Sequence, residues 1–137
     1  MGIESLWKIG IATRDLDESC RLFTQVLGLA PGPKGPFESL GQKIAICQLG
    51  DVSIELIEPV APDAPIAKFI EQRGEGLQHI GFRVSDIEGL VSNLKKKGIE
   101  FVQDAPVEAE FEATKAKFIF ARPRSFHGVL VEFVELL

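Results

Sequence analysis

Two glutamates, one histidine and one lysine are the residues of this sequence whose types suit chemistry at a shared centre. Glu55 and Glu132 each stand in a run of the form apolar-Glu-apolar-apolar-Glu. Lys8 and His79 each stand two residues before a glycine in a strand-like run. Carboxylate oxygens and an imidazole nitrogen bind divalent ions, and a carboxylate also serves as a general base. The four residues therefore predict a metal-binding or proton-transfer site.

The runs that carry these residues have the alternation of β-strands. Strand alternation places Lys8 and His79 away from their apolar neighbours, and it does the same for Glu55 and Glu132. A buried carboxylate is costly unless it is paired, protonated or bound to a metal. We therefore predict that these side chains share one concave face. The alternative is that the glutamates lie at exposed strand positions and that His79 is merely hydrogen-bonded.

The chain contains two copies of one segment, and the copies relate the four residues in pairs. LWKIGIATRDLDESCRLFTQVLGL is matched by LQHIGFRVSDIEGLVSNLKKKGI, which starts 71 positions later. The closing runs around Glu55 and Glu132 lie 77 positions apart. Two matches at nearly equal offsets predict an internal duplication. In it Lys8 corresponds to His79, and Glu55 corresponds to Glu132.

Each copy is expected to contain a strand, a helix and about three further strands. Asp15 and Asp86 stand where a helix N-cap is needed, and Gly28 and Gly98 stand where a helix ends. Short extended pieces are expected at 37–40 and 100–103, and longer strands at 43–49, 54–58, 117–121 and 131–135. The Pro/Gly-rich segment 30–36 is expected to be a loop.

The composition is that of one globular domain. The chain has 137 residues, of which 45% are hydrophobic and 26% charged. A net charge of −5 argues against a nucleic-acid partner, and the apolar runs are too short to span a membrane. The N-terminal residues lack the pattern of a signal peptide, and Cys20 and Cys47 form no redox or metal motif. A cytoplasmic protein with reduced thiols is expected.

The segment from Gly50 to Ile99 and the ending PRSFHGVLVEFVE resemble the vicinal oxygen chelate superfamily, and within it the methylmalonyl-CoA epimerases. Glyoxalases, extradiol dioxygenases and antibiotic-resistance proteins belong to the same superfamily. The resemblance implies an α+β fold in which two tandem βαβββ modules form a cupped mixed sheet around a metal. A single domain over residues 1–137 is expected, with one module at about 5–59, a linker at about 60–75 and the second module at about 76–137.

The resemblance implies metal ligands at His79 and Glu132 and an extra ligand position at Glu55. The first histidine of the family pattern is replaced, because position 8 is lysine before the same Ile-Gly-Ile-Ala run. A protonated lysine has three donors and no acceptor, so it repels a cation. Three outcomes stay open. A divalent ion (Co, Mn, Ni, Zn or Mg) binds weakly through the other ligands, the Lys8 ammonium replaces it, or the chain binds a ligand without catalysis.

The activity implied is proton transfer beside a carbonyl in a small dicarbonyl acyl thioester or oxo-acid, as in epimerases and glyoxalases. Glu132, Glu55 and Lys8 are then the expected catalytic residues of an isomerase or lyase. A small-molecule ligand is expected, with an acyl-CoA as one candidate, and the chain is expected to be a homodimer. The alternative is a non-catalytic small-molecule-binding protein of the same fold.

Cations in the second half are candidates for contacts to a ligand's phosphates, with solvated surface cations as the commoner alternative. They are Lys115, Lys117, Arg122 and Arg124. His127 stands beside an expected turn and is predicted to lie at the surface.

Overall fold

The computed structural model describes residues 2–137, which divide into two compact units. One unit comprises Lys8–Gln78, and the other comprises His79–Leu137 together with the start of the chain up to Trp7. The single domain expected from the sequence stays a prediction.

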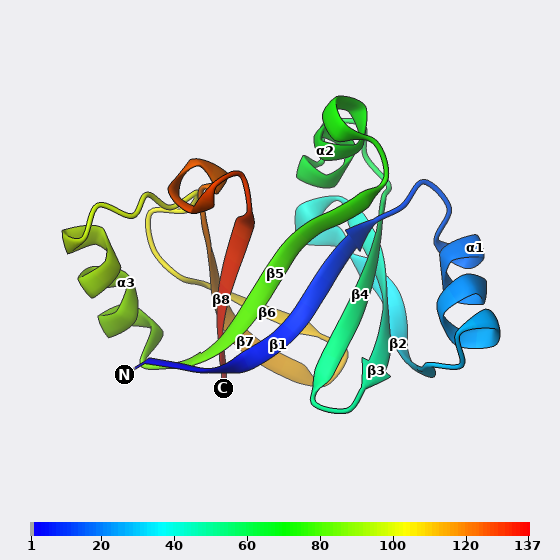
Figure 1. Cartoon of the computed structure of the whole chain (residues 1–137), viewed down its shortest axis with the longest axis horizontal. Helices are drawn as coiled ribbons and strands as arrows, with labels where there is room; N and C mark the ends of the chain where they lie inside the picture. Colours follow the sequence, from blue (N-terminus) through cyan, green and yellow to red (C-terminus); the bar gives the residue numbers. More distant parts are fainter. Residues whose placement is uncertain (1) are drawn as a thin grey trace. The chain divides into compact units, whose positions relative to one another are not determined.

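Two successive βαβββ modules follow one another along the chain (Figure 1). The first consists of β1 (Gly2–Ala12), α1 (Leu16–Cys20) with a π-helical continuation (Arg21–Val26), β2 (Ala30–Phe37), a 3-10 turn (Glu38–Leu40), β3 (Gln42–Leu49) and β4 (Val52–Pro59). The helix α2 (Pro65–Arg73) follows. The second consists of β5 (Gly76–Ser85), α3 (Ile87–Lys96), β6 (Val107–Phe111), β7 (Thr114–Ala121), a 3-10 turn (Pro123–Phe126) and β8 (Leu130–Leu136).

The strands of the two modules pair in the same way. In the first module β2 is antiparallel to β3, β3 is antiparallel to β4, and β4 is parallel to β1. In the second, β6 is antiparallel to β7, β7 is antiparallel to β8, and β8 is parallel to β5. The predicted α+β class with two tandem βαβββ modules is therefore confirmed.

The register of the parallel pairs matches the offsets in the sequence. Gly10 of β1 lies opposite Glu55 of β4, and Gly81 of β5 lies opposite Glu132 of β8. The two glycines are 71 positions apart and the two glutamates 77. The residues that the sequence pairs as equivalents thus occupy the same place in each module.

Aspartates begin the two module helices, as predicted. The Asp15 side chain accepts a hydrogen bond from the backbone N–H of Glu18 at 3.1 Å, and Asp86 accepts one from Gly89 at 3.2 Å. Each bond satisfies a backbone donor that lacks a partner within the helix. Gly28 (φ +82°) and Gly98 (φ +91°) lie just past the two helices, in a conformation that favours glycine.

The second glutamate of each closing run also binds a helix start. Glu58 of β4 accepts from the backbone N–H of Leu16 at 2.8 Å, and Glu135 of β8 accepts from that of Ile87 at 2.8 Å. A carboxylate in this place also interacts favourably with the helix dipole. The repeated apolar-Glu-apolar-apolar-Glu run therefore ties the last strand of each module to its helix.

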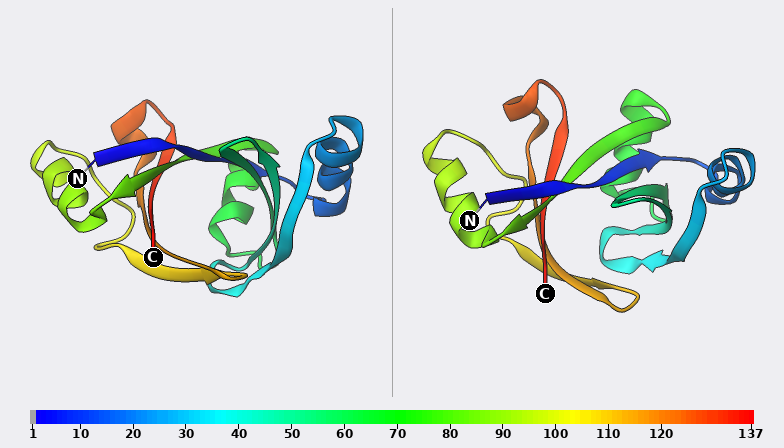
Figure 2. Two further views of the ribbon diagram at one scale, coloured as in Figure 1. Left: turned by 90° about the horizontal axis from the view of Figure 1, so that it is seen from below. Right: turned by 60° about the horizontal axis from the view of Figure 1, so that its bottom comes forward.

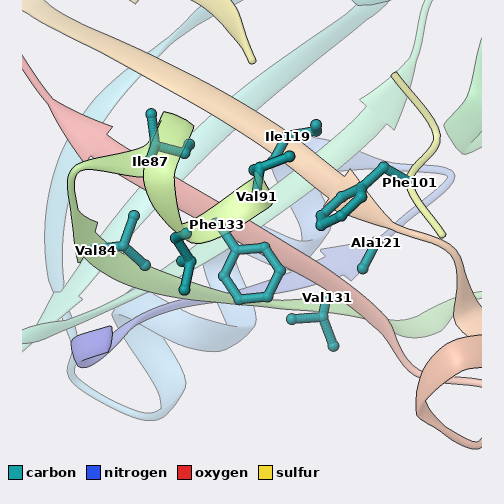
Figure 3. Packing of buried hydrophobic residues seen from close by; sticks show 9 residues of the cluster. Val84, Ile87, Val91, Phe101, Ile119, Ala121, Val131 and Phe133 are labelled. Atoms are coloured by element: carbon teal, nitrogen blue, oxygen red, sulfur yellow. The ribbon is translucent and has the colours of Figure 1, made fainter. Parts of the chain in front are cut away.

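Each unit has its own apolar core. In the first, α1 packs on β3 and β4 (Figure 2), and the buried residues are Leu16, Ala45, Cys47, Ile54 and Leu56. In the second, side chains of α3 meet those of β7 and β8, with the rings of Phe101 and Phe133 6.3 Å apart (Figure 3).

Cys20 and Cys47 are free thiols, and burial raises the pKa of the Cys47 thiol.

The helix α2 was not predicted from the sequence, which suggested a plain linker at 60–75. Pro65 occupies its first turn, where a missing N–H costs nothing, and Ile66 and Ile70 are buried. These isoleucines are four positions apart, so they lie on the same face of the helix.

Among residues 2–137 no helix combines the length and apolar character that crossing a membrane requires.

Three further expectations were wrong. The short extended piece expected at 37–40 is a 3-10 turn over Glu38–Leu40. The Pro/Gly-rich segment 30–36 is not a loop but most of β2, which pairs with β3 and has a register shift between Pro31 and Lys34. The strand β2 pairs with one neighbour and is therefore an edge strand. An edge strand tolerates proline, which has no backbone N–H to donate. The extended piece expected at 100–103 is reduced to a bridge between Phe101 and Ala121, and β6 begins at Val107.

We predict that Glu135→Gln lowers the free energy of unfolding by about 1 kcal/mol, because the charge at the start of α3 is lost. Urea unfolding followed by circular dichroism measures the change. Glu110→Gln, at an exposed position of β6, serves as the matched control and should change stability by less than about 0.5 kcal/mol. Equal effects of the two substitutions would contradict this assignment.

Candidate functional site

The first module places a lysine and a glutamate together. Lys8 lies on β1 and Glu55 on the parallel neighbour β4, where Glu55 stands opposite Gly10. The Lys8 Nζ donates to Glu55 Oε2 at 3.2 Å, and the two side chains are 14% and 10% exposed. The reading of Glu55 as a solvent-facing strand residue is therefore wrong. This charged pair sits largely shielded from water.

The second module places a histidine and a glutamate in the equivalent positions. His79 lies on β5 and Glu132 on β8, and their side chains are 3% and 6% exposed. The distance from His79 Nε2 to Glu132 Oε1 is 3.7 Å. This exceeds the usual 2.7–3.2 Å of an N–H···O hydrogen bond. The alternative of an exposed Glu132 is wrong as well.

A phenylalanine that was not singled out in the sequence flanks the histidine. Phe120 of β7 stands opposite Glu132, and its ring meets the His79 ring edge to face, with the centroids 5.5 Å apart. In the first module the residue opposite Glu55 is Ile46. The sequence could have indicated this phenylalanine through the run KFIFA, because strand alternation places every second side chain of the run on the same face.

The two pairs of side chains differ in how well they could bind a divalent ion. An imidazole nitrogen and a carboxylate oxygen that share one tetrahedral ion are separated by about 3.4 Å, which the 3.7 Å between His79 and Glu132 approaches. Lys8 supplies no acceptor, and its ammonium is bonded to the neighbouring Glu55. The second pair therefore fits a metal as two ligands, and the first does not.

No group of three or more His, Cys, Asp or Glu side chains with the arrangement of a metal site is found among residues 2–137.

Two of the cations considered for phosphate contacts are engaged in surface ion pairs. Lys117 binds Glu88 at 2.8 Å, which raises the pKa of the lysine, and Arg124 binds Glu100. His127 is exposed, as predicted.

Comparison with known proteins gives relatives along nearly the whole chain. A Bacillus subtilis protein named as uncharacterized, YqjC, is 33% identical over 127 residues, which cover 93% of this chain and 89% of that protein. The mitochondrial methylmalonyl-CoA epimerase of Mus musculus is 31% identical over 134 residues, covering 93% of this chain and 74% of the epimerase.

Solved structures share the fold. A variant of Streptomyces coelicolor methylmalonyl-CoA epimerase, in complex with 2-nitronate-propionyl-CoA, has a TM-score of 0.90 at 26% identity and covers 98% of this chain and 95% of its own. A methylmalonyl-CoA epimerase in complex with methylmalonyl-CoA and NH4+ has the same TM-score, identity and coverage. The α+β fold expected from the resemblance is confirmed by these structures.

Residues 8–120 match the sequence model of the Glyoxalase/Bleomycin resistance protein/Dioxygenase superfamily. The match spans most of both modules, and it agrees with the resemblance carried by the central segment and the closing run. The chain therefore belongs to the Glyoxalase/Bleomycin resistance protein/Dioxygenase superfamily, and methylmalonyl-CoA epimerases are among its relatives.

Proposed function

We propose that this chain catalyses proton transfer beside the carbonyl of a small dicarbonyl acyl thioester or oxo-acid, in the manner of an epimerase. One observation carries the proposal: each module buries a carboxylate against a nitrogen side chain at equivalent positions, Lys8 with Glu55 and His79 with Glu132. The epimerase relatives give the reaction class. An acyl-CoA is the first ligand to test, because two solved neighbours are complexes with acyl-CoA compounds.

The proposal gives the carboxylate and the nitrogen side chain of a module separate roles. A carboxylate, Glu132 or Glu55, takes the α-proton while the electrons of the C–H bond move to the carbonyl oxygen, which gives an enolate. In the first module the Lys8 ammonium stabilises the negative oxygen, and in the second module His79 takes the corresponding position. A proton from water is then added to the opposite face of the planar carbon, which inverts the configuration, and the glutamic acid formed in the first step releases its proton to water.

The ligand set inferred from the resemblance, His79 with Glu132 and Glu55, stays a prediction for a divalent metal. The lysine at position 8 does not fit such an ion, because it supplies no acceptor and its ammonium is bonded to Glu55. One epimerase structure contains NH4+ together with methylmalonyl-CoA. Lys8 carries the same kind of cation as part of the chain.

We predict that the chain exchanges the α-hydrogen of methylmalonyl-CoA for deuterium in D2O faster than the protein-free reaction does. Mass spectrometry of the thioester measures the exchange. The double substitution Glu55→Gln/Glu132→Gln should slow it by about 100-fold or more, because both candidate general bases are lost. Glu110→Gln is the matched control and should leave the rate unchanged. Exchange at the protein-free rate with the unaltered chain, for acyl thioesters and oxo-acids alike, would contradict the proposal.

A non-catalytic binding protein is the second candidate, and the lysine favours it. Lys8 stands where the second module has an imidazole, and an ammonium can donate to an anionic oxygen of a ligand without any chemical step.

We predict that the chain both binds methylmalonyl-CoA and exchanges its α-hydrogen. Calorimetric titration measures the binding, and the deuterium assay measures the exchange. Catalysis requires both signals from the unaltered chain. Saturable binding without exchange would favour the non-catalytic function and reject the proposed one.

A further inference from the structure

We propose that Phe120 determines specificity: its ring contacts the alkyl group on the α-carbon of the ligand and limits the size of the alkyl group that can bind. The ligand class, a dicarbonyl acyl thioester, rests on the proposed function, whereas the size limit is a further property of the site. Phe120 and the residues that it contacts all belong to the second module.

Phe120 lies on the same face of the sheet as the acid and the imidazole of the second module. It stands opposite Glu132 in the antiparallel pairing of β7 with β8, and opposite residues project to the same face. Its ring meets the His79 ring with the centroids 5.5 Å apart and the planes at 84°. The neighbours Ile119 and Ala121 pack with α3 on the other face (Figure 3). Phe120 is therefore an apolar group that borders the acid and the imidazole.

A second phenylalanine holds the Phe120 ring in place. The ring of Phe118 meets it edge to face, with the centroids 5.7 Å apart and the planes at 73°. Such contacts between rings are favourable beyond the area that they bury. Phe118 is 8% exposed, whereas Phe120 is only half-buried. The Phe120 ring is thus packed against two other rings and keeps accessible surface that a ligand can contact.

The α-carbon of the proposed ligand carries four groups, and the alkyl group is the apolar one that varies in size. The others are the thioester carbonyl, the second carbonyl group and the hydrogen that is exchanged. Burying a carbonyl or carboxylate oxygen against a phenyl ring without a donor is costly, whereas burying an alkyl group there is favourable. A ligand whose α-hydrogen lies at Glu132 therefore places its alkyl group against Phe120, which stands opposite that glutamate.

The first module has an aliphatic side chain in the equivalent place. Ile46 stands opposite Glu55, as Phe120 stands opposite Glu132. A phenyl ring is larger than an isoleucine side chain, and a ring packed between other rings cannot move aside without losing those contacts. The size limit is therefore a property of the second module.

The first test is calorimetric titration of the unaltered chain with malonyl-CoA, methylmalonyl-CoA and butylmalonyl-CoA. Methylmalonyl-CoA should bind at least about 3-fold more tightly than malonyl-CoA, because one methyl group is removed from water. Butylmalonyl-CoA should bind at least about 10-fold more weakly than methylmalonyl-CoA, because the ring leaves no room for the longer group. Equal affinities for the three compounds overturn the inference.

The second test changes the size of the ring in both directions. Phe120→Leu should raise the affinity for butylmalonyl-CoA relative to methylmalonyl-CoA by at least about 10-fold, because the smaller side chain gives room. Phe120→Trp should lower the affinity for methylmalonyl-CoA relative to malonyl-CoA by a similar factor. Phe82→Leu is the matched control, because Phe82 belongs to the same module and packs against the core beneath α3, and it should leave both ratios unchanged.

Thermal unfolding checks that each variant is folded, and the titrations of the unaltered chain decide if the Phe120 variants are not. Unchanged ratios in both folded Phe120 variants, or an equal shift in Phe82→Leu, overturn the inference.

The outcome is separable from that of the proposed function, which the deuterium assay tests. Size-dependent binding without exchange supports the inference and rejects catalysis. Exchange together with binding that does not depend on size supports catalysis and overturns the inference. Absence of binding by all three compounds overturns the inference, and exchange of other dicarbonyl ligands then decides the proposed function.

Discussion

The burial of a carboxylate beside a nitrogen side chain is the constraint on which each module depends. A carboxylate removed from water is costly unless a partner compensates its charge. The parallel pairing of the first and last strands supplies that partner, because it holds Glu55 beside Lys8 and Glu132 beside His79. The second glutamate of each closing run then binds the helix start of the same module. One short run thus contributes both to the site and to the fold around it.

The two modules keep this frame and differ in its chemistry. In the second, an imidazole with a carboxylate at 3.7 Å resembles half of a metal site, and Phe120 packs against the imidazole. In the first, the Lys8 ammonium donates a hydrogen bond to the Glu55 carboxylate. An imidazole with a carboxylate can stabilise negative charge on a ligand oxygen as metal ligands, whereas an ammonium can do so by direct donation. Position 8 therefore differs in chemistry from its counterpart His79, although the strand register around the two residues is the same.

Much of the fold follows from local patterns in the sequence. The duplication, the Asp15 and Asp86 caps and the equivalence of the two glutamates were predictable, because each depends on residue type and spacing. The strand β2 was missed because proline signals a loop unless the strand lies at an edge, and pairing partners are not local information. The helix α2 was missed because its apolar signal is short, two isoleucines after Pro65.

The candidate site was predicted in its residue types and pairs but not in its contacts. Sequence spacing named Lys8 and Glu55 as members of one site, and left open whether the lysine binds the acid or turns away. The 3.2 Å contact and the low exposure of both side chains depend on packing that no local pattern encodes. Phe120 was overlooked for the same reason, since its contact with His79 arises from the pairing of β7 with β8.

The most direct measurement is a crystal structure of the chain with methylmalonyl-CoA, prepared in chelator and again with Co²⁺. Our account predicts that the Lys8 ammonium lies within hydrogen-bond distance of a ligand oxygen, with Glu55 still bonded to it, and that Co²⁺ leaves this arrangement unchanged. A Co²⁺ ion held by His79, Glu132 and Glu55, with Lys8 turned away from the ligand, would contradict it.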